Sequence, residues 1–285
     1  MNTLSYLVTP ELPADALCRQ TLDALPLVFF DVETTGLFPS QGHRICELAL
    51  LRVCNGEIQA QFSTLVDPQR PLEARAFAIN GISEELLRDA PPFRQIAAIV
   101  QELLDDAVVI AHNAPFDMAF LGRELMLLGR PLPANPVFDT LVLARRLLRR
   151  HSYSLKALSC DLGLSRPEHR AMSDVWALYG LFRYLAEQLA ALGITALGDV
   201  LRYQRGLFPE QPDPVQPPLV SQALREGRQL RIIYRSRSSP EPTERYIYPL
   251  ELTQERSGVF LRAFCFLRDD WRSFALDKIE VMELV

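Results

Sequence analysis

Two acidic residues early in the chain have the type and spacing of metal ligands. Asp31 and Glu33 follow the apolar segment 27–30, which predicts a strand buried on both faces. Side chains alternate along a strand, so residues two apart project to the same side. Two adjacent carboxylates repel each other unless a cation lies between them, and oxygen ligands favour Mg²⁺ or Mn²⁺. For this pair alone, a solvated strand end is an equally good interpretation.

A second segment places an acid at a strand-to-helix junction. Residues 107–111 are apolar and predict another buried strand. Asn113 is a residue type that begins helices, and Pro115 suits a first helical turn, so Asp117 falls within that turn. An acid at this position complements the helix dipole, and that is the better interpretation if Asp117 is taken alone.

A third segment opens a long helix over residues 170–191. Val175, Leu178 and Phe182 recur at helical spacing, and Asp174 lies near the helix start. His169 precedes Asp174 by five residues. Taken alone, the histidine is a surface or capping residue and the aspartate is a solvated helical acid.

Taken together, the three segments closely resemble the motifs of the DEDDh exonucleases. That ribonuclease H-like family includes the proofreading subunit of bacterial replicative DNA polymerase. The resemblance covers about residues 26–190 and extends to the segments 44–49, 80–83, 138–140 and 154–158. One departure is Asn80, where the family often has a histidine. The tyrosine branch of the family has Tyr four residues before the last Asp, and that position here is Arg170.

The resemblance implies a 3′→5′ exonuclease with two divalent ions, Mg²⁺ or Mn²⁺. Its implied metal ligands are Asp31, Glu33, Asp117 and Asp174, and its implied general base is His169. The implied substrate contacts are Thr34, Thr35, Gly36, Leu37, His112, Asn113 and Phe116. We expect single-stranded DNA ends as substrate, nucleoside 5′-monophosphates as product and a role in DNA repair or nucleic-acid processing. RNA as substrate, or a regulator that binds ends without cleaving them, are the alternatives.

Composition is that of an ordinary globular protein. The 285 residues carry a net charge of −5, which argues against a strong nonspecific grip on long duplex DNA. No apolar segment approaches 18 residues, and residues 1–12 have no signal-peptide pattern. Five scattered cysteines without a Cys-x-x-Cys pair fit a reducing compartment. We therefore expect a cytoplasmic protein without a membrane segment, whose further candidate partners are a second copy, a polymerase or a repair protein.

The pattern predicts an α/β exonuclease domain, with a mixed central sheet flanked by helices, and a small β domain. We expect an N-terminal lead at 1–25, the exonuclease domain at 26–191, a helical and proline-rich linker at 192–218 and a second domain at 219–285. Within the first domain, Asn55-Gly56 predicts a hairpin. The expected helices cover 14–24, 84–104 with a break at 91–92, 115–128, 140–149, 155–162 and 170–191.

The C-terminal segment has a helical stretch at 219–228 followed by short alternating stretches. Strands are predicted at 230–234, 245–250, 259–266 and 272–276. The segments 223–228, 232–236, 245–250, 264–268 and 272–279 resemble the WYL domain, an SH3/Sm-like β module. Such modules are regarded as sensors of nucleic acid or nucleotides, which suggests binding by Arg235, Arg245, Arg262 and Arg272. Solvated strand residues are the alternative, and Ala275 replaces an arginine usual in the family.

Overall fold

The chain forms two compact units in a computed structural model. The first ends at Gln204 and the second begins at Arg205. The structure describes residues 15–131, 133–236 and 241–285. Residues 1–14, which make up more than half of the expected N-terminal lead, therefore lie outside the described part. Within these ranges no helix is long and apolar enough to cross a membrane.

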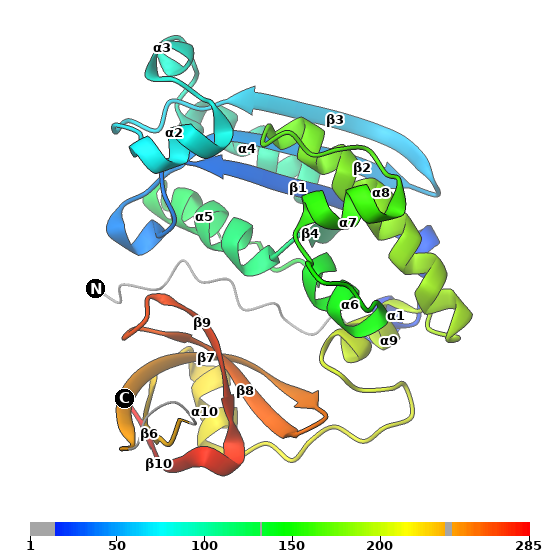
Figure 1. Cartoon of the computed structure of the whole chain (residues 1–285), viewed down its shortest axis with the longest axis vertical. Helices are drawn as coiled ribbons and strands as arrows, with labels where there is room; N and C mark the ends of the chain where they lie inside the picture. Colours follow the sequence, from blue (N-terminus) through cyan, green and yellow to red (C-terminus); the bar gives the residue numbers. More distant parts are fainter. Residues whose placement is uncertain (1–14, 132, 237–240) are drawn as a thin grey trace. The chain divides into compact units, whose positions relative to one another are not determined.

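A five-stranded mixed sheet forms the centre of the first unit (Figure 1). Its strands are β1 (Leu27–Thr34), β2 (Ile45–Cys54), β3 (Glu57–Leu65), β4 (Val108–Ala111) and β5 (Val137–Asp139). They lie in the order β3-β2-β1-β4-β5. Strand β2 is antiparallel to both of its neighbours, β1 and β3, whereas β4 runs parallel to β1 and β5 runs parallel to β4. Since parallel strands end at the same edge, the residues that follow β1 and β4 are brought together there.

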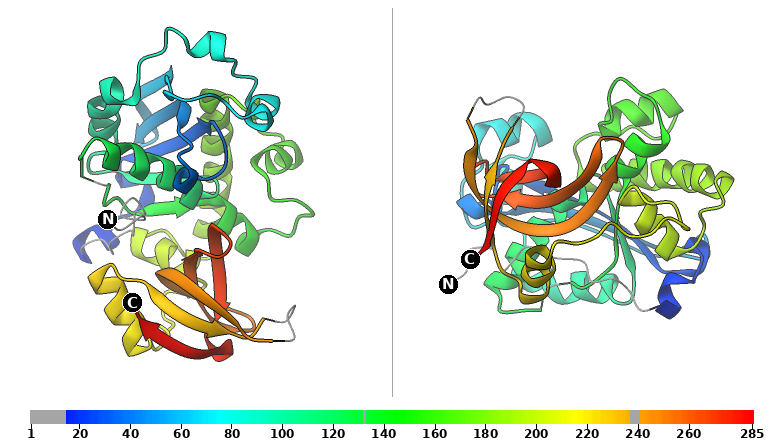
Figure 2. Two further views of the ribbon diagram at one scale, coloured as in Figure 1. Left: turned by 90° about the vertical axis from the view of Figure 1, so that its left-hand side faces the viewer. Right: turned by 90° about the horizontal axis from the view of Figure 1, so that it is seen from below.

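Helices cover both faces of this sheet (Figure 2). The described helices of this unit are α1 (Asp15–Cys18), α2 (Ala74–Asn80), α3 (Glu84–Leu87), α4 (Phe93–Leu104), α5 (Ala114–Leu127), α6 (Thr140–Leu147), α7 (Leu155–Leu162), α8 (Ala171–Ala191) and α9 (Leu197–Gln204), with short 3-10 turns at Leu22–Ala24 and Pro39–Gln41. Phe29 of β1 packs among apolar residues of α6, α8 and α9, whereas Val28 and Phe30 pack with α4 and α5. Alternation along β1 therefore directs Asp31 and Glu33 to the α8 face.

The predicted hairpin between β2 and β3 is confirmed. Asn55 and Gly56 separate the strands, and their φ values are 52° and 76°. Positive φ at both central residues is the geometry of a two-residue type I′ turn, which suits asparagine followed by glycine. The turn sets the β2–β3 register, in which Cys54 lies opposite Glu57. In the separate β1–β2 pairing, Glu47 of β2 lies directly opposite Glu33 of β1.

The second unit is one helix packed on an antiparallel sheet. The helix is α10 (Pro218–Glu226), and the strands are β6 (Leu230–Tyr234), β7 (Thr243–Glu255), β8 (Gly258–Cys265), β9 (Asp270–Ala275) and β10 (Ile279–Leu284), with a 3-10 turn at Leu276–Lys278. The order is β10-β6-β7-β8-β9, and the register shifts between Pro249 and Glu251. Such a bulge bends a long strand. Val220 and Ala223 of α10 lie in the core with Ile232 and Ile247.

Three elements and two boundaries differ from the sequence expectation. α2, β5 and β10 were not predicted, and each is seven residues or shorter. α9 belongs to the first unit, although the sequence assigned 192–218 to a linker. Its Leu197 and Val200 are buried in that unit, and the Gln204 amide hydrogen-bonds to the backbone of β5. Leu22 and Leu25, assigned to the lead, are buried in the same core.

Candidate active site

Acidic side chains from three elements converge beside the end of β1. Asp31 and Glu33 are half-buried on β1, while Asp117 of α5 and Asp174 of α8 are 3% and 8% exposed. The Val32 backbone N–H donates to Asp117 Oδ1 at 3.2 Å, which ties the start of α5 to β1. The predicted strand-to-helix junction therefore delivers Asp117 to the β1 carboxylates.

His169 lies among these acids. A nitrogen of its ring and carboxylate oxygens of Glu33 and Asp174 all lie within 4.8 Å of one another. The residue is exposed, and its backbone is left-handed, with φ of 56°. The Asp174 carboxylate accepts backbone hydrogen bonds from Glu168, His169 and Arg170, so the chain turns tightly around it. The first turn of α8 thus carries an acid, and the residue just before the helix places an exposed imidazole beside it.

Burial makes this cluster electrostatically unfavourable without a cation. Burial, and then the charges of Asp117, Asp174 and Glu33, raise the pKa of Asp31 well above its usual range. Burial, with Asp174 and Glu47, raises the pKa of Glu33 from 4.5 to about 7. Burial also raises the pKa of Asp117 and of Asp174. A divalent cation would favour the charged forms of these oxygen ligands, so the donor set fits a hard metal ion.

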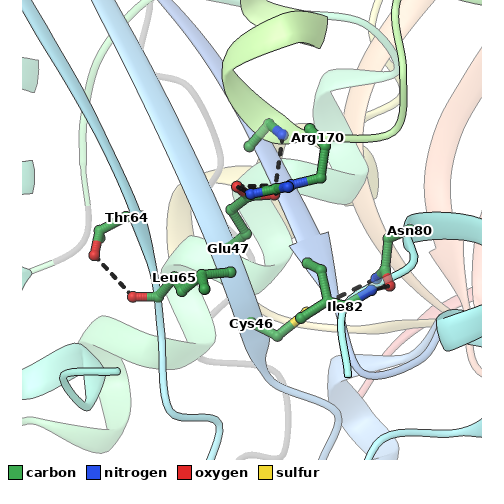
Figure 3. Close-up of polar contacts among 8 residues, drawn as sticks. Cys46, Glu47, Thr64, Leu65, Asn80, Ile82 and Arg170 are labelled. Atoms are coloured by element: carbon green, nitrogen blue, oxygen red, sulfur yellow. Dashed lines mark hydrogen bonds and ion pairs between the residues drawn. The ribbon is translucent and has the colours of Figure 1, made fainter. Parts of the chain in front are cut away.

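Asn80, at the end of α2, also belongs to the site. Its amide hydrogen-bonds to Glu33, which lowers the pKa of that acid, and lies 3.9 Å from Cys46 Sγ. The Asn80 side-chain oxygen accepts the Ile82 N–H at 3.0 Å (Figure 3). An amide therefore occupies the position where the resemblance suggests a histidine, and it acts as a donor to a candidate ligand.

The loop after β1 is held from within by His43, which the sequence analysis did not single out. His43 is 3% exposed; its Nδ1 lies 3.1 Å from the Thr35 hydroxyl and its Nε2 3.0 Å from Glu73. The Thr34 hydroxyl donates to the Gly36 carbonyl at 2.7 Å. Both threonine hydroxyls thus form hydrogen bonds within the loop. Of the expected contacts in this loop, Leu37 presents the exposed side chain, at 49%.

Gly36, one of the implied substrate contacts, also has a structural role in the loop. A Cβ at this position would overlap the imidazole ring of His43. The glycine therefore admits a protein side chain beneath the loop. Its contact with a substrate stays a prediction.

The three expected substrate contacts near the end of β4 have different surroundings. His112 is engaged at both ring nitrogens, each 2.9 Å from its partner, the Thr140 hydroxyl and the Tyr153 carbonyl. Burial lowers the pKa of His112. Asn113 occupies the N-cap of α5 in a left-handed conformation, without the side-chain capping bond that the sequence suggested. Phe116 is half-buried against Phe120, with ring centroids 4.9 Å apart.

Three of the four candidate arginines of the second unit are paired with acids on neighbouring strands or along their own strand. Arg235 binds Glu280, Arg262 binds Glu251 and Arg272 binds Asp270. Arg245 differs, because its Nε is buried without a hydrogen-bond partner among the described residues, and its Nη1 lies 3.8 Å from Cys265 Sγ. The interpretation as solvated strand residues therefore suits the three paired arginines better than it suits Arg245.

Comparison with known families agrees with both parts of the chain. The family model described as Exonuclease matches residues 28–182, and the WYL domain model matches residues 218–284. The first match spans more than half of the chain, so this protein belongs to that exonuclease family and carries a WYL domain. The expected α/β ribonuclease H-like fold with its mixed sheet, and the antiparallel β fold of the second unit, are confirmed.

Curated relatives share the first unit. The DNA polymerase III subunit epsilon-like protein of Rhodobacter capsulatus is 40% identical over 192 residues, covering 65% of this chain and 27% of that protein. The DNA polymerase III subunit epsilon of Rickettsia prowazekii is 40% identical over 142 residues, covering 48% and 62%. This chain therefore spans less than two thirds of either relative. Among solved structures, cell-death related nuclease 4 is similar in fold, with a TM-score of 0.50 and 15% identity over 61% of this chain and 66% of that one.

Proposed function

We propose that this protein is a metal-dependent 3′→5′ exonuclease that removes nucleotides from single-stranded DNA ends. One observation carries the proposal: carboxylates from β1, α5 and α8 gather with the ring of His169 at one edge of the sheet. Membership of the exonuclease family and the epsilon-type relatives support the same reaction class. In this proposal the products are nucleoside 5′-monophosphates, and the role lies in repair or nucleic-acid processing.

In the proposed reaction each side chain has a distinct task. Asp31, Glu33, Asp117 and Asp174 would hold two divalent cations, which stabilise charge on the reacting phosphate oxygens when bound. His169 accepts a proton from the attacking water at its ring nitrogen, which its exposure permits. Leu37 packs against the terminal base, since it is the exposed apolar residue of the adjacent loop.

The decisive test compares wild-type protein with Asp174→Asn on matched oligonucleotides. We expect 5′-labelled single-stranded DNA to shorten progressively in Mn²⁺ or Mg²⁺, and the variant to lose this activity while keeping its fold. The loss should exceed about 10²-fold, because a ligand to the reacting centre is removed. Matched RNA and blunt duplex DNA serve as competing substrates. Faster cleavage of RNA would assign the enzyme to RNA, and specific binding without cleavage would make it a regulator.

A separate proposal concerns the WYL domain, which we regard as a nucleic-acid-sensing module. Arg245 is its leading candidate, because the guanidinium has no carboxylate partner among the described residues. An arginine already paired with an acid has to exchange that partner for a phosphate, so Arg235, Arg262 and Arg272 are weaker candidates.

A further inference from the structure

An ion pair between an exposed arginine and a buried glutamate joins the start of α8 to strand β2 (Figure 3). Glu47 is 3% exposed and lies opposite Glu33 in the β1–β2 pair. Arg170 Nε lies 3.0 and 3.2 Å from its two oxygens, and Arg170 Nη2 lies 2.9 Å from Oε1. The backbone N–H of Ala171 donates to Oε2 at 3.2 Å. Both oxygens of Glu47 are therefore occupied by α8, and this acid acts as an anchor beside the candidate ligands.

The anchored segment is the one that presents His169. This residue lies in the left-handed region, which a histidine adopts only when its surroundings hold it there. On one side, the Glu168 N–H is bound to Asp174 Oδ1 at 3.0 Å. On the other side, Arg170 and Ala171 are bound to Glu47. The exposed imidazole is thus directed by the backbone on both sides of it.

The same arrangement occurs a second time in this unit. Arg44 Nε and Nη2 each lie 2.6 Å from an oxygen of Glu124, a 2% exposed residue of α5. The next backbone N–H, that of Ile45, lies 3.3 Å from Glu124 Oε1. This pair joins the start of β2 to α5 and shares no residue with the turn at 168–171. It supplies a matched control, because the same guanidinium atoms bind a buried glutamate, although Arg44 is less exposed than Arg170.

We propose that Arg170 is a positioning residue, whose pairing with Glu47 holds the 168–171 turn so that His169 faces Glu33 and Asp174. The inference rests on the proposed function, in which His169 is the general base. A fork-like guanidinium bound to a buried carboxylate gives directional restraint that a single exposed ion pair does not. Misplacement of a reacting group by about 1 Å can cost on the order of 10²-fold in rate.

The test is a double-mutant cycle between Arg170 and His169 in the full-length protein. His169→Asn removes the base, and asparagine tolerates a left-handed backbone. In the presence of His169, we expect Arg170→Ala to lower kcat about 10-fold while KM changes less than about 2-fold. In the His169→Asn background, the same change should lower kcat less than about 2-fold, because no base remains to be positioned. Arg170→Lys should recover part of the loss.

Arg44→Ala is the matched control. It removes the same kind of pair, so we expect a lower unfolding midpoint with kcat within about 2-fold of wild type. If Arg170→Ala does not fold, Glu47→Gln replaces it in the cycle, since glutamine keeps an acceptor for the Ala171 N–H.

Three outcomes would overturn the positioning role. An equal loss of kcat in both backgrounds would show that Arg170 acts on the metal ligands or the fold in general. A raised KM with unchanged kcat would show that it binds substrate directly. Unchanged kcat and KM would show that the pair has no kinetic role. Wild-type protein without nuclease activity is a different result, because it would contradict the proposed function first.

Discussion

Glu33 is subject to burial and to two neighbouring acids at once. Together these raise its pKa from 4.5 to about 7. Because the unfolded chain keeps the ordinary value, the folded protein retains a proton on Glu33 over a pH range where the unfolded chain has lost it. A group with a raised folded-state pKa contributes stability that is present below the unfolded pKa and is lost as pH rises through the folded pKa. Without metal, the free energy of unfolding should therefore fall as the pH rises from about 4.5 to 7.

We expect Glu33→Gln to flatten the pH dependence of stability in the metal-free protein. The difference in unfolding free energy between variant and wild type should be larger at pH 8 than at pH 5. The increase should be at most about 3 kcal/mol in favour of the variant, since one pKa unit corresponds to about 1.4 kcal/mol. Urea unfolding in EDTA at both pH values measures this difference. Mn²⁺ should stabilise the wild-type protein more at pH 8 than at pH 5. Parallel curves for variant and wild type would contradict the assignment of the pKa shift.

The candidate ligands could be predicted from the sequence because each lies in a short motif. Their partners could not. Glu47 lies within the matching segment 44–49, but its contact with Arg170 joins residues 123 positions apart. The role of His43 depends on the fold of the loop above it and on Glu73 from beyond β3. Local spacing carries no information about such pairs.

At the scale of elements, the loop between β1 and β2 depends on His43 lying beneath Gly36. We expect Gly36→Ala to destabilise the protein by about 1–3 kcal/mol, because the added methyl group overlaps the imidazole ring. The loop carries Leu37, so cleavage should also slow. Chemical denaturation of the single variant, of His43→Ala and of the double variant measures the coupling. In the His43→Ala background the added methyl group should cost much less. Equal costs in both backgrounds would rule out the clash as the cause.

The strongly periodic elements were predictable, and the short ones were not. The long α8 and the hairpin at Asn55 follow from helical spacing and from turn chemistry. β5 has three residues and becomes a strand only because β4 and the Gln204 amide supply its hydrogen bonds. α2 lacks a side-chain N-cap bond, which removes a usual starting signal.

At the scale of the whole molecule, each unit has a hydrophobic core of its own. We therefore expect residues 1–204 to fold and to cleave single-stranded DNA without the second unit. The truncated protein should bind single strands more weakly and with a shallower dependence on salt, because phosphate-binding arginines are removed. Affinity measured over a range of salt concentrations tests this.

Arg245→Ala and Arg272→Ala, made in the full chain, separate the candidate arginines. The first should reproduce part of the loss on truncation, and the second should change binding less, since Arg272 is already paired with Asp270. Identical affinity and salt slope for full-length and truncated protein would show that the WYL domain serves another ligand or a partner.

The order of strands also bears on which parts of the protein open first. β1 is the middle strand of its sheet, with β2 and β4 on either side, whereas β3 is an edge strand with mostly exposed or half-exposed residues. Amide protons on the outer side of β3 have no neighbouring strand, so we expect them to exchange readily, whereas those of residues 27–29 of β1 lie between two strands and should exchange last. Asp31 and Glu33 lie beyond the part of β1 that pairs with β4, and among the strands only β2 pairs with them. The bond from the Val32 N–H to Asp117 takes the place of a strand on the other side, so a local opening at this end of β1 would separate the ligands before the core of the unit unfolds.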